Sequence, residues 1–148
     1  MARQLRTALP DGFFHITARG VDGFSIYRDA TDYLAFLSLL LRVVRRFEWD
    51  VLAMCLMPNH YHLVLESTQE RLSSGCHRLN GVYAQAFNAR HDRRGHLFGD
   101  RFWSSVLATD AHLNAACRYV PWNPVRAGLC TRPSEWPWTR SRYGVDAA

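Results

Sequence analysis

The sequence contains no lysine, and all 18 of its basic residues are arginine. A GC-rich genome would explain the choice of arginine over lysine, but it would not explain the excess of positive charge. The formal net charge is +5 and the isoelectric point is near 9.4. The planar guanidinium of arginine makes bidentate contacts with phosphate and stacks on bases. Together with five Trp, six Tyr and eight Phe, the positive charge favours a domain that binds nucleic acid.

The sequence also lacks a long apolar run. No segment approaches the ~18 apolar residues of a membrane-spanning helix, and Met1–Pro10 lacks the apolar core of a secretion signal. We therefore expect a cytoplasmic protein that makes no membrane contact. Apolar residues make up 48% of the 148 residues and charged residues 21%, which is typical of a folded protein. Because no repeat, linker or low-complexity segment divides the chain, we expect one domain over residues 1–148.

The cysteines are spread along the chain without a C-x-x-C pair. They are Cys55, Cys76, Cys117 and Cys130. This spacing argues against a zinc ribbon and, in a chain without a secretion signal, against a disulfide framework.

Hydrophobic periodicity and turn residues divide the chain into strands and helices. We expect strands at 13–19, 49–57, 60–66 and 102–108, and helices at 31–47, 72–88 and 110–120. Asp29 or Thr31 is the expected cap of the first helix, and Thr109 or Asp110 that of the third. This order predicts an α+β fold in which helices pack on one antiparallel sheet, with a ferredoxin-like core as the first choice.

His60 and His62 lie two residues apart in a predicted strand, so their side chains point to the same face. Pro58-Asn59 forms a tight turn, and the register that follows places Met57 opposite His60 and Cys55 opposite His62. The helices should cover the other face, which leaves the histidine face for chemistry. The face expected to lie under the helices is apolar and carries Leu52, Met54, Leu56, Tyr61, Leu63 and Leu65.

A same-face histidine pair favours a metal site, although half-buried sheet histidines would show the same pattern. A third ligand has two candidate sources. Cys55 with the two histidines would indicate zinc. Alternatively, Tyr119 and Asn123 are four residues apart, which places them on one face of an unbroken helix. A phenol beside a metal can act as a nucleophile on phosphate, although Tyr119 could equally be a packed side chain.

Four ordered segments resemble those of the REP-associated tyrosine transposases, which are single-tyrosine members of the HUH (His, hydrophobic, His) group related to insertion-sequence transposases. Met-Pro-Asn-His-Tyr-His at 57–62 resembles the HUH motif, and Phe-His-Ile-Thr-Ala-Arg-Gly at 14–20 resembles the first strand. Gly-His-Leu-Phe at 95–98, with Arg-Phe at 101–102, resembles the basic loop. The segment that carries the family's nucleophile is similar to Arg-Tyr-Val at 118–120 with Asn-Pro-Val-Arg-Ala-Gly at 123–128. Trp-Pro-Trp at 136–138 fits the C-terminal pattern, and the resemblance covers roughly residues 3–143.

This resemblance implies an HUH nuclease or transposase with a ferredoxin-like sheet. It makes His60 and His62 metal ligands, Tyr119 the nucleophile and Asn123 a third ligand. Tyr119 would attack a phosphodiester of single-stranded, hairpin-forming DNA and leave a 5′-phosphotyrosine and a free 3′-OH, with Mg²⁺ or Mn²⁺ as cofactor. The sequence leaves monomer and homodimer open. The candidate DNA-contact residues are Arg3, Arg6, Arg93, Arg94, Arg101 and Arg126.

Two positions depart from the family's pattern. Pro121 lies between Tyr119 and Asn123, and it must kink or end the helix because proline lacks the backbone N–H and disfavours helical geometry before it. Asp100 stands immediately before Arg101, where the family tends to have glycine, and this weakens the case for Arg101 as a phosphate contact.

Three hypotheses therefore stand for the function. The first is a transposase that cleaves and rejoins single-stranded repeats. The second is a hairpin-DNA-binding protein of the same fold whose catalytic site Pro121 has impaired. The third, which ranks well below the others, is a small zinc hydrolase that uses Cys55, His60 and His62.

Overall fold

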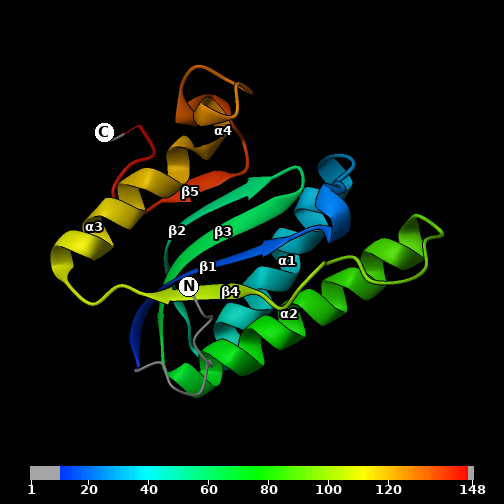
Figure 1. Ribbon diagram of the computed structural model, residues 1–148, viewed down its shortest axis with the longest axis horizontal. Coiled ribbons are helices and arrows are strands. Elements are labelled where there is room, and N and C mark those ends of the chain that lie inside the picture. The colour runs from blue at the N-terminus through cyan, green and yellow to red at the C-terminus, as the bar shows by residue number, and fades with distance from the viewer. Residues whose placement is uncertain (1–10, 147–148) are drawn as a thin grey trace.

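The computed structural model describes residues 11–146, which fold around an antiparallel sheet of five strands in the order β4-β1-β3-β2-β5 (Figure 1). The strands are β1 (Gly12–Arg19), β2 (Asp50–Met57), β3 (His60–Ser67), β4 (Trp103–Val106) and β5 (Thr139–Ser141). The first four strands, with two helices on one face, make the predicted ferredoxin-like arrangement. The α+β fold expected from the sequence is therefore confirmed, and β5 adds an edge strand that was not predicted.

Two long helices, α1 (Ala30–Phe47) and α2 (Gln69–Arg90), lie behind the sheet in Figure 1. The Asp29 side chain caps α1, as expected, by accepting a hydrogen bond from the Asp32 N–H. α2 begins earlier than predicted because the Thr68 side chain caps it by accepting from the Arg71 N–H. No helix among residues 11–146 has both the length and the apolar character that crossing a bilayer requires.

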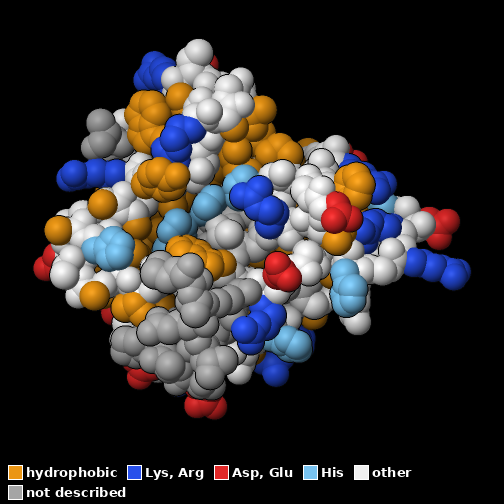
Figure 2. Space-filling model, in the orientation of Figure 1, with side chains coloured by type: hydrophobic (Ala, Val, Ile, Leu, Met, Phe, Trp, Pro, Cys, Tyr) orange, Lys and Arg blue, Asp and Glu red, His pale blue; other side chains and the backbone are white. Residues whose placement is uncertain are grey.

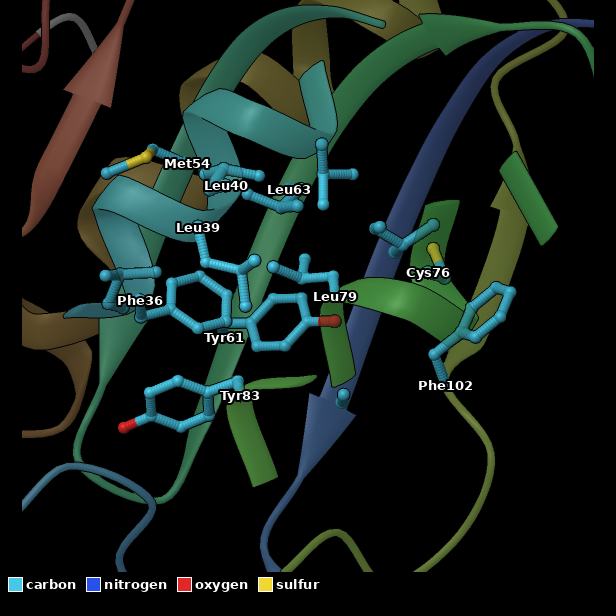
Figure 3. Close-up of a cluster of buried hydrophobic side chains, with 14 of the residues drawn as sticks. Phe36, Leu39, Leu40, Met54, Tyr61, Leu63, Cys76, Leu79, Tyr83 and Phe102 are labelled. Atoms are coloured by element: carbon cyan, nitrogen blue, oxygen red, sulfur yellow. The ribbon is translucent and has the colours of Figure 1, made fainter. Parts of the chain in front are cut away.

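The main core lies between the two helices and the sheet. Tyr61, which separates the two histidines in sequence, is fully buried there, and its hydroxyl donates to Asn80 Oδ1 at 2.6 Å. The predicted alternation of β3 is thus confirmed, because Tyr61 points to the helices while its neighbours point away. Figure 3 shows the tight packing of this core, including Phe36, Leu39, Leu40, Met54, Tyr61, Leu63, Leu79 and Tyr83.

The other face of the sheet carries a second, smaller core, which corrects two predictions. The β2–β3 register shifts between Val51 and Ala53, and this irregularity turns Leu52 to the histidine face instead of the helix face. The histidine face is also not left open along its whole length, because the segment after β4 packs on part of it. The second core consists of Leu52, Ala53, Cys55, Met57, Val64, Leu107, Leu113, Ala116, Cys117 and Val120.

The helix that covers this second core, α3 (Asp110–Tyr119), begins at the predicted cap Thr109. It ends at Tyr119 and is followed by the short helices η3 (Val120–Trp122) and α4 (Asn123–Arg126). The predicted effect of Pro121 is therefore confirmed. Tyr119, Val120 and Asn123 all keep right-handed helical dihedral angles, but the Asn123 N–H bonds to the Val120 carbonyl three residues back. The chain after Tyr119 therefore continues as a tighter, 3-10 helical turn and keeps its direction.

The C-terminal tryptophans attach β5 to the sheet. Trp136 Nε1 donates to the Leu56 carbonyl at 2.8 Å, and the Leu56 N–H donates to the Trp138 carbonyl at 3.0 Å. The Trp138 ring stacks on Tyr33 of α1 with centroids 4.5 Å apart. The Trp-Pro-Trp segment follows the short helix η4 (Pro133–Glu135). Its contacts with the sheet and with α1 show that it has a structural role.

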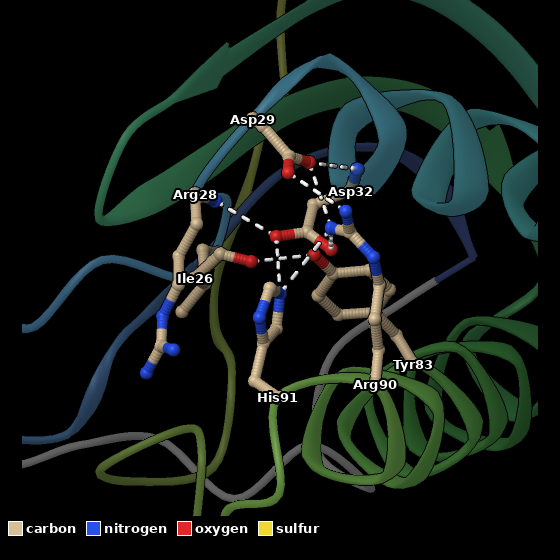
Figure 4. A network of polar contacts seen from close by, with 7 residues as sticks. All are labelled: Ile26, Arg28, Asp29, Asp32, Tyr83, Arg90 and His91. Atoms are coloured by element: carbon tan, nitrogen blue, oxygen red, sulfur yellow. Dashed lines mark hydrogen bonds and ion pairs between the residues drawn. The ribbon is translucent and has the colours of Figure 1, made fainter.

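A buried carboxylate joins the start of α1 to the end of α2. Asp32 is 2% exposed; its Oδ1 accepts from Arg90 Nη1 at 2.7 Å and its Oδ2 from His91 Nε2 at 2.8 Å (Figure 4). The Arg90 guanidinium also donates to both carboxylate oxygens of Asp29, and it lowers the pKa of Asp29 to about 2. This network fixes the two helices that support the sheet from behind.

Candidate active site

His60 and His62 lie at the start of β3 on the part of the sheet face that α3 leaves uncovered. Both side chains are half-buried. Thr17 and Arg19 of β1 pair directly with His62 and His60, so they share this face. Figure 2 shows histidine side chains in a row across the middle of the molecule, with arginine side chains on both sides. The predicted pairs Met57–His60 and Cys55–His62 across the hairpin are confirmed.

The hydrogen bonds of His62 fit the tautomer that carries its hydrogen on Nδ1. The Thr17 hydroxyl donates its one hydrogen to the Tyr61 carbonyl at 2.9 Å, and the same oxygen lies 2.8 Å from His62 Nδ1. With the hydrogen of His62 on Nδ1, the Thr17 oxygen accepts it, and His15 Nε2, 2.9 Å from Nδ1, shares it as a second acceptor. A neutral imidazole with its hydrogen on Nδ1 keeps a lone pair on Nε2.

The orientation of His60 is fixed in the same way by the turn residue that precedes it. His60 Nδ1 lies 2.7 Å from Asn59 Oδ1, which can only accept, so Nδ1 carries the hydrogen. The Asn59 amide is oriented in turn because its Nδ2 donates to the Gly23 carbonyl at 3.3 Å. His60 therefore also keeps its lone pair on Nε2, and the two ring centroids are 5.0 Å apart.

Burial keeps these imidazoles neutral. Desolvation, with a smaller contribution from the Arg19 charge, lowers the pKa of His60 to about 4. Desolvation also lowers the pKa of His62 to about 3, followed by the effects of His15, His60, Arg126 and Arg19. The pKa of His15 falls to about 4 for the same main reason. Neutral imidazole is the form that binds a metal ion.

The donor set fits a divalent cation with two protein ligands. In this tautomer both histidines donate Nδ1–H to an oxygen, and metal-binding histidines usually donate their other ring N–H in this way. Among residues 11–146, no group of three or more His, Cys, Asp or Glu side chains is placed to hold a metal. Such a pair leaves the remaining positions of the cation to an amide oxygen, water or substrate phosphate.

The structure argues against Cys55 as the third ligand. Its side chain is fully buried under α3, and its Sγ contacts Thr139 Oγ1 at 3.6 Å. Burial raises the pKa of the thiol to about 11, and among residues 11–146 Cys55 does not form a group of three possible metal ligands with His60 and His62. The zinc-hydrolase hypothesis loses its ligand set.

Tyr119 lies at the end of α3 and is 53% exposed. The Arg126 guanidinium sits over its ring, 3.6 Å from the centroid, and donates to the Tyr119 carbonyl at 2.8 Å. The helix α3 packs on the histidine face of the sheet through Leu113, Ala116 and Cys117, and the charge of Arg126 contributes to the lowered pKa of His62. A cation over an aromatic face is attractive and restricts the orientation of the ring.

Asn123 is linked to Tyr119 through Arg126. Its Oδ1 accepts from Arg126 Nη2 at 3.0 Å, and its Nδ2 donates to the Val120 carbonyl at 3.0 Å. The tight turn at Pro121 replaces the simple one-turn spacing that an unbroken helix would give. The structure thus joins Tyr119, Asn123 and Arg126 into one cluster, and the role of Asn123 as a metal ligand stays a prediction.

The other predicted arginines are placed in different ways. Arg3 and Arg6 lie outside the described residues. Arg93 is occupied within its own loop, where it donates to Asn88 Oδ1 at 3.1 Å and to the His96 carbonyl at 2.8 Å. Arg94 and Arg101 are exposed. Arg93 therefore stabilises the basic loop, and its contact with DNA stays a prediction.

Sequence reasoning missed the residues that orient the imidazoles. His15, Thr17 and Arg19 belong to β1, whose pairing with β3 depends on the tertiary fold. The alternation of that strand could have grouped them on one face, because Phe14, Ile16 and Ala18 occupy the other. Their position opposite the histidines needed the strand order.

A family described as "Transposase IS200 like" matches residues 24–123, which include the histidine pair and Tyr119. The chain belongs to the IS200-like transposase family. The resemblance to transposases related to insertion-sequence elements, drawn from the sequence motifs, is thereby confirmed.

Individual relatives of this transposase are distant in sequence. A Haemophilus influenzae protein named as a candidate REP-associated tyrosine transposase is 22% identical over 135 residues, which span 79% of this chain and 73% of that protein. A REP-associated tyrosine transposase solved in complex with a REP hairpin covers the whole chain and 92% of its own, with a TM-score of 0.72 and 20% identity. A candidate transposase from Deinococcus radiodurans R1 covers 77% of this chain and 92% of its own, with a TM-score of 0.54 and 13% identity. At these identities, the structural likeness shows the fold.

Proposed function

We propose that this protein cleaves and rejoins single-stranded, hairpin-forming DNA, with Tyr119 as the nucleophile and a divalent metal ion at the histidine pair. The observation that carries the proposal is the orientation of His60 and His62. Thr17 Oγ1 and Asn59 Oδ1 lie within hydrogen-bond distance of the two Nδ1 atoms, and with the hydrogens on Nδ1 both Nε2 lone pairs remain for a cation. We expect the protein to act in the cytoplasm.

The chemistry of Tyr119 would be a direct displacement at phosphorus. The Oη atom gives its proton to water and forms a bond to phosphorus; the bond from phosphorus to the 3′ oxygen breaks, and that oxygen takes up a proton from water. The products are a 5′-phosphotyrosine and a free 3′-OH, and the reverse displacement by a 3′-OH rejoins the strand. Arg126 would hold the Tyr119 ring in place for this attack, since its guanidinium lies over the ring.

The cofactor we propose is Mg²⁺ or Mn²⁺, held by Nε2 of His60 and His62, with the amide oxygen of Asn123 as a third ligand. When bound, such an ion polarises a phosphate and stabilises the charge that develops on it. Asn123 would first have to release the Arg126 guanidinium, which now bonds to its oxygen. The guanidinium would stay over the Tyr119 ring, and the N–H released by Asn123 would be available to contact the DNA.

The proposed substrate rests on charge and on a structural relative. The net charge of +5 favours a polyanion. A solved REP-associated tyrosine transposase of the same fold was captured with a REP hairpin. Hairpin DNA with an unpaired flank is therefore the first substrate to test.

The decisive experiment is a covalent-adduct assay with this substrate. Purified protein, incubated with a labelled hairpin oligonucleotide and Mg²⁺ or Mn²⁺, should yield a protein–DNA band that survives denaturing electrophoresis. Tyr119→Phe should abolish the band without changing the thermal unfolding curve. Tyr143→Phe is the matched control, because Tyr143 is a comparably exposed tyrosine, at 56%, beyond β5. An adduct that persists in Tyr119→Phe would rule out the proposed nucleophile.

A second candidate function is binding of hairpin DNA without cleavage. The observation that favours it is the tight turn at Pro121, after which Asn123 bonds to Arg126 and Val120. In that case the protein would bind the hairpin with a steep salt dependence. No adduct would form with either metal.

A further inference from the structure

A cavity of about 650 Å³ adjoins the histidine pair and has no part in the chemistry described above. Thr17, Arg19 and Trp103 line it on the sheet side. The segments 20–23 and 99–101 form its other walls. Thr17 also bonds to His62, and Arg19 pairs with His60 across the sheet. The cavity therefore shares a wall with the proposed catalytic centre.

Trp103 gives this cavity an aromatic surface. It stands opposite Thr17 in the β1–β4 pairing, so its side chain lies on the histidine face, and it is 45% exposed. The His15 ring meets it edge-on with centroids 5.6 Å apart, which fixes the ring's position. An exposed, oriented indole beside a polyanion site is suited to stacking on an unpaired base.

Arg19 adds a positive charge on the same side of the cavity. Its side chain is exposed at the end of β1. Arg19 pairs with His60 between β1 and β3, which places it close to the histidine pair. A phosphate bound between Arg19 and the histidines would therefore contact the Arg19 guanidinium.

Backbone hydrogen bonds hold the cavity in shape. The Gly20 N–H donates to the Asn59 carbonyl at 2.8 Å, and the Gly99 N–H donates to the Arg19 carbonyl at 3.0 Å. A Cβ atom on Gly20 would lie only 2.1 Å from the Phe24 carbonyl oxygen, so glycine is required there. Asn59 also connects the cavity to the metal site, because it bonds both to the Gly23 carbonyl and to His60.

We propose that this cavity binds the unpaired nucleotide adjoining the cleaved phosphodiester, with its base stacked on Trp103 and its phosphate at Arg19. This inference rests on the proposed function for the nature of the substrate. It adds a site that holds the strand by a base, whereas the histidines and Tyr119 act only on the backbone. Stacking accepts any base, so the site positions the strand and does not read its sequence.

The test compares two labelled probes of equal length, oligothymidylate and a strand made only of abasic residues. Binding is followed by fluorescence anisotropy in EDTA, so that cleavage cannot contribute. Wild-type protein should prefer oligothymidylate about tenfold, within the range expected for one stacked base. Trp103→Ala should bind both probes equally, and Trp103→Phe should keep part of the preference. Arg19→Gln should weaken both probes alike and lower the salt dependence.

Tyr143→Ala is the matched control, since it removes an exposed aromatic ring away from the cavity and should keep the full preference. The proposal is overturned if Trp103→Ala retains the thymidine preference or weakens both probes by the same factor. It is also overturned if wild-type protein does not distinguish the probes. The adduct assay tests the proposed function separately. If Trp103 causes a preference for oligothymidylate but no adduct forms, the cavity binds a base and the proposed cleavage chemistry is wrong. If an adduct forms but wild-type protein shows no such preference, the cleavage chemistry stands and the proposed base-binding site is wrong.

Discussion

Replacing Gly75 by alanine should destabilise the protein, although alanine is the better helix former. Gly75 lies in α2 directly against Trp49, which is 5% exposed. A Cβ atom at this position would lie 2.3 Å from Trp49 Cζ2 and 2.8 Å from Cε2. Optimal carbon contacts are about 3.5–4.0 Å, so the indole must move. The hydrogen bond from Trp49 Nε1 to the Arg71 carbonyl, at 3.2 Å, opposes that movement.

Two opposing effects determine how much Gly75→Ala changes the free energy of unfolding. Overpacking of a tight core site costs about 1–3 kcal/mol, and alanine in place of glycine returns up to about 1 kcal/mol of helix propensity. Gly81 provides the matched control in the same helix, because nothing lies within 4 Å of a Cβ atom there. Gly81→Ala should therefore stabilise the protein by up to about 1 kcal/mol, and the two variants should differ by roughly 1–3 kcal/mol.

Urea unfolding followed by circular dichroism measures both differences. For a chain of this length, each kcal/mol also shifts the melting temperature by roughly 2–4 °C. The order of stability should be Gly81→Ala, then wild type, then Gly75→Ala. If Gly75→Ala were as stable as Gly81→Ala, the close packing of Trp49 against α2 would be wrong.

Two further predictions concern the site and its supporting helices. Thr17→Val removes the acceptor for His62 Nδ1–H, so the affinity for Mn²⁺ measured by calorimetry should fall about 10- to 100-fold. Thr17→Ser keeps the hydroxyl and should bind Mn²⁺ as the wild type does. Equal losses of Mn²⁺ affinity in both variants would show that the Thr17 hydroxyl does not orient His62. Arg90→Gln should lower the free energy of unfolding at neutral pH, and its deficit relative to wild type should shrink as the pH falls. The sign follows from the pKa of Asp29, which Arg90 lowers to about 2: the stabilisation is full above the unfolded pKa of about 3.9 and disappears as the pH falls through the folded value. A deficit that stays constant down to pH about 2 would contradict this ion-pair account.

The sequence predicted the sheet and its helices because their signals are local. The alternation in His60–Ser67 and the turn at Pro58-Asn59 determined the hairpin register, and Asp29 and Thr109 marked two helix starts. Leu52 could not be placed correctly, since a register shift of one residue arises from how β2 fits β3. β5 was missed because three residues carry no periodicity, and its position depends on Trp136 and Trp138.

The candidate site was predicted only in part, for the same reason. Spacing alone placed His60 and His62 on one face, and the proline rule foresaw that α3 would end near Pro121. The residues that orient the imidazoles come from β1 and from the hairpin turn, and only the tertiary pairing brings them together. Likewise, the contact of Arg126 with Tyr119 requires the tight turn between them, which no helical spacing rule describes.

The central claim is that Tyr119 becomes covalently linked to DNA. Cleavage after arginine releases it in the peptide 119–126, Tyr-Val-Pro-Trp-Asn-Pro-Val-Arg, in which it is the single tyrosine. After reaction with a hairpin oligonucleotide and Mn²⁺ and digestion of the DNA, tandem mass spectrometry of this peptide is the most direct measurement. We expect a nucleotide phosphate attached at Tyr119. A nucleotide found on another tyrosine, with the 119–126 peptide unmodified, would contradict it.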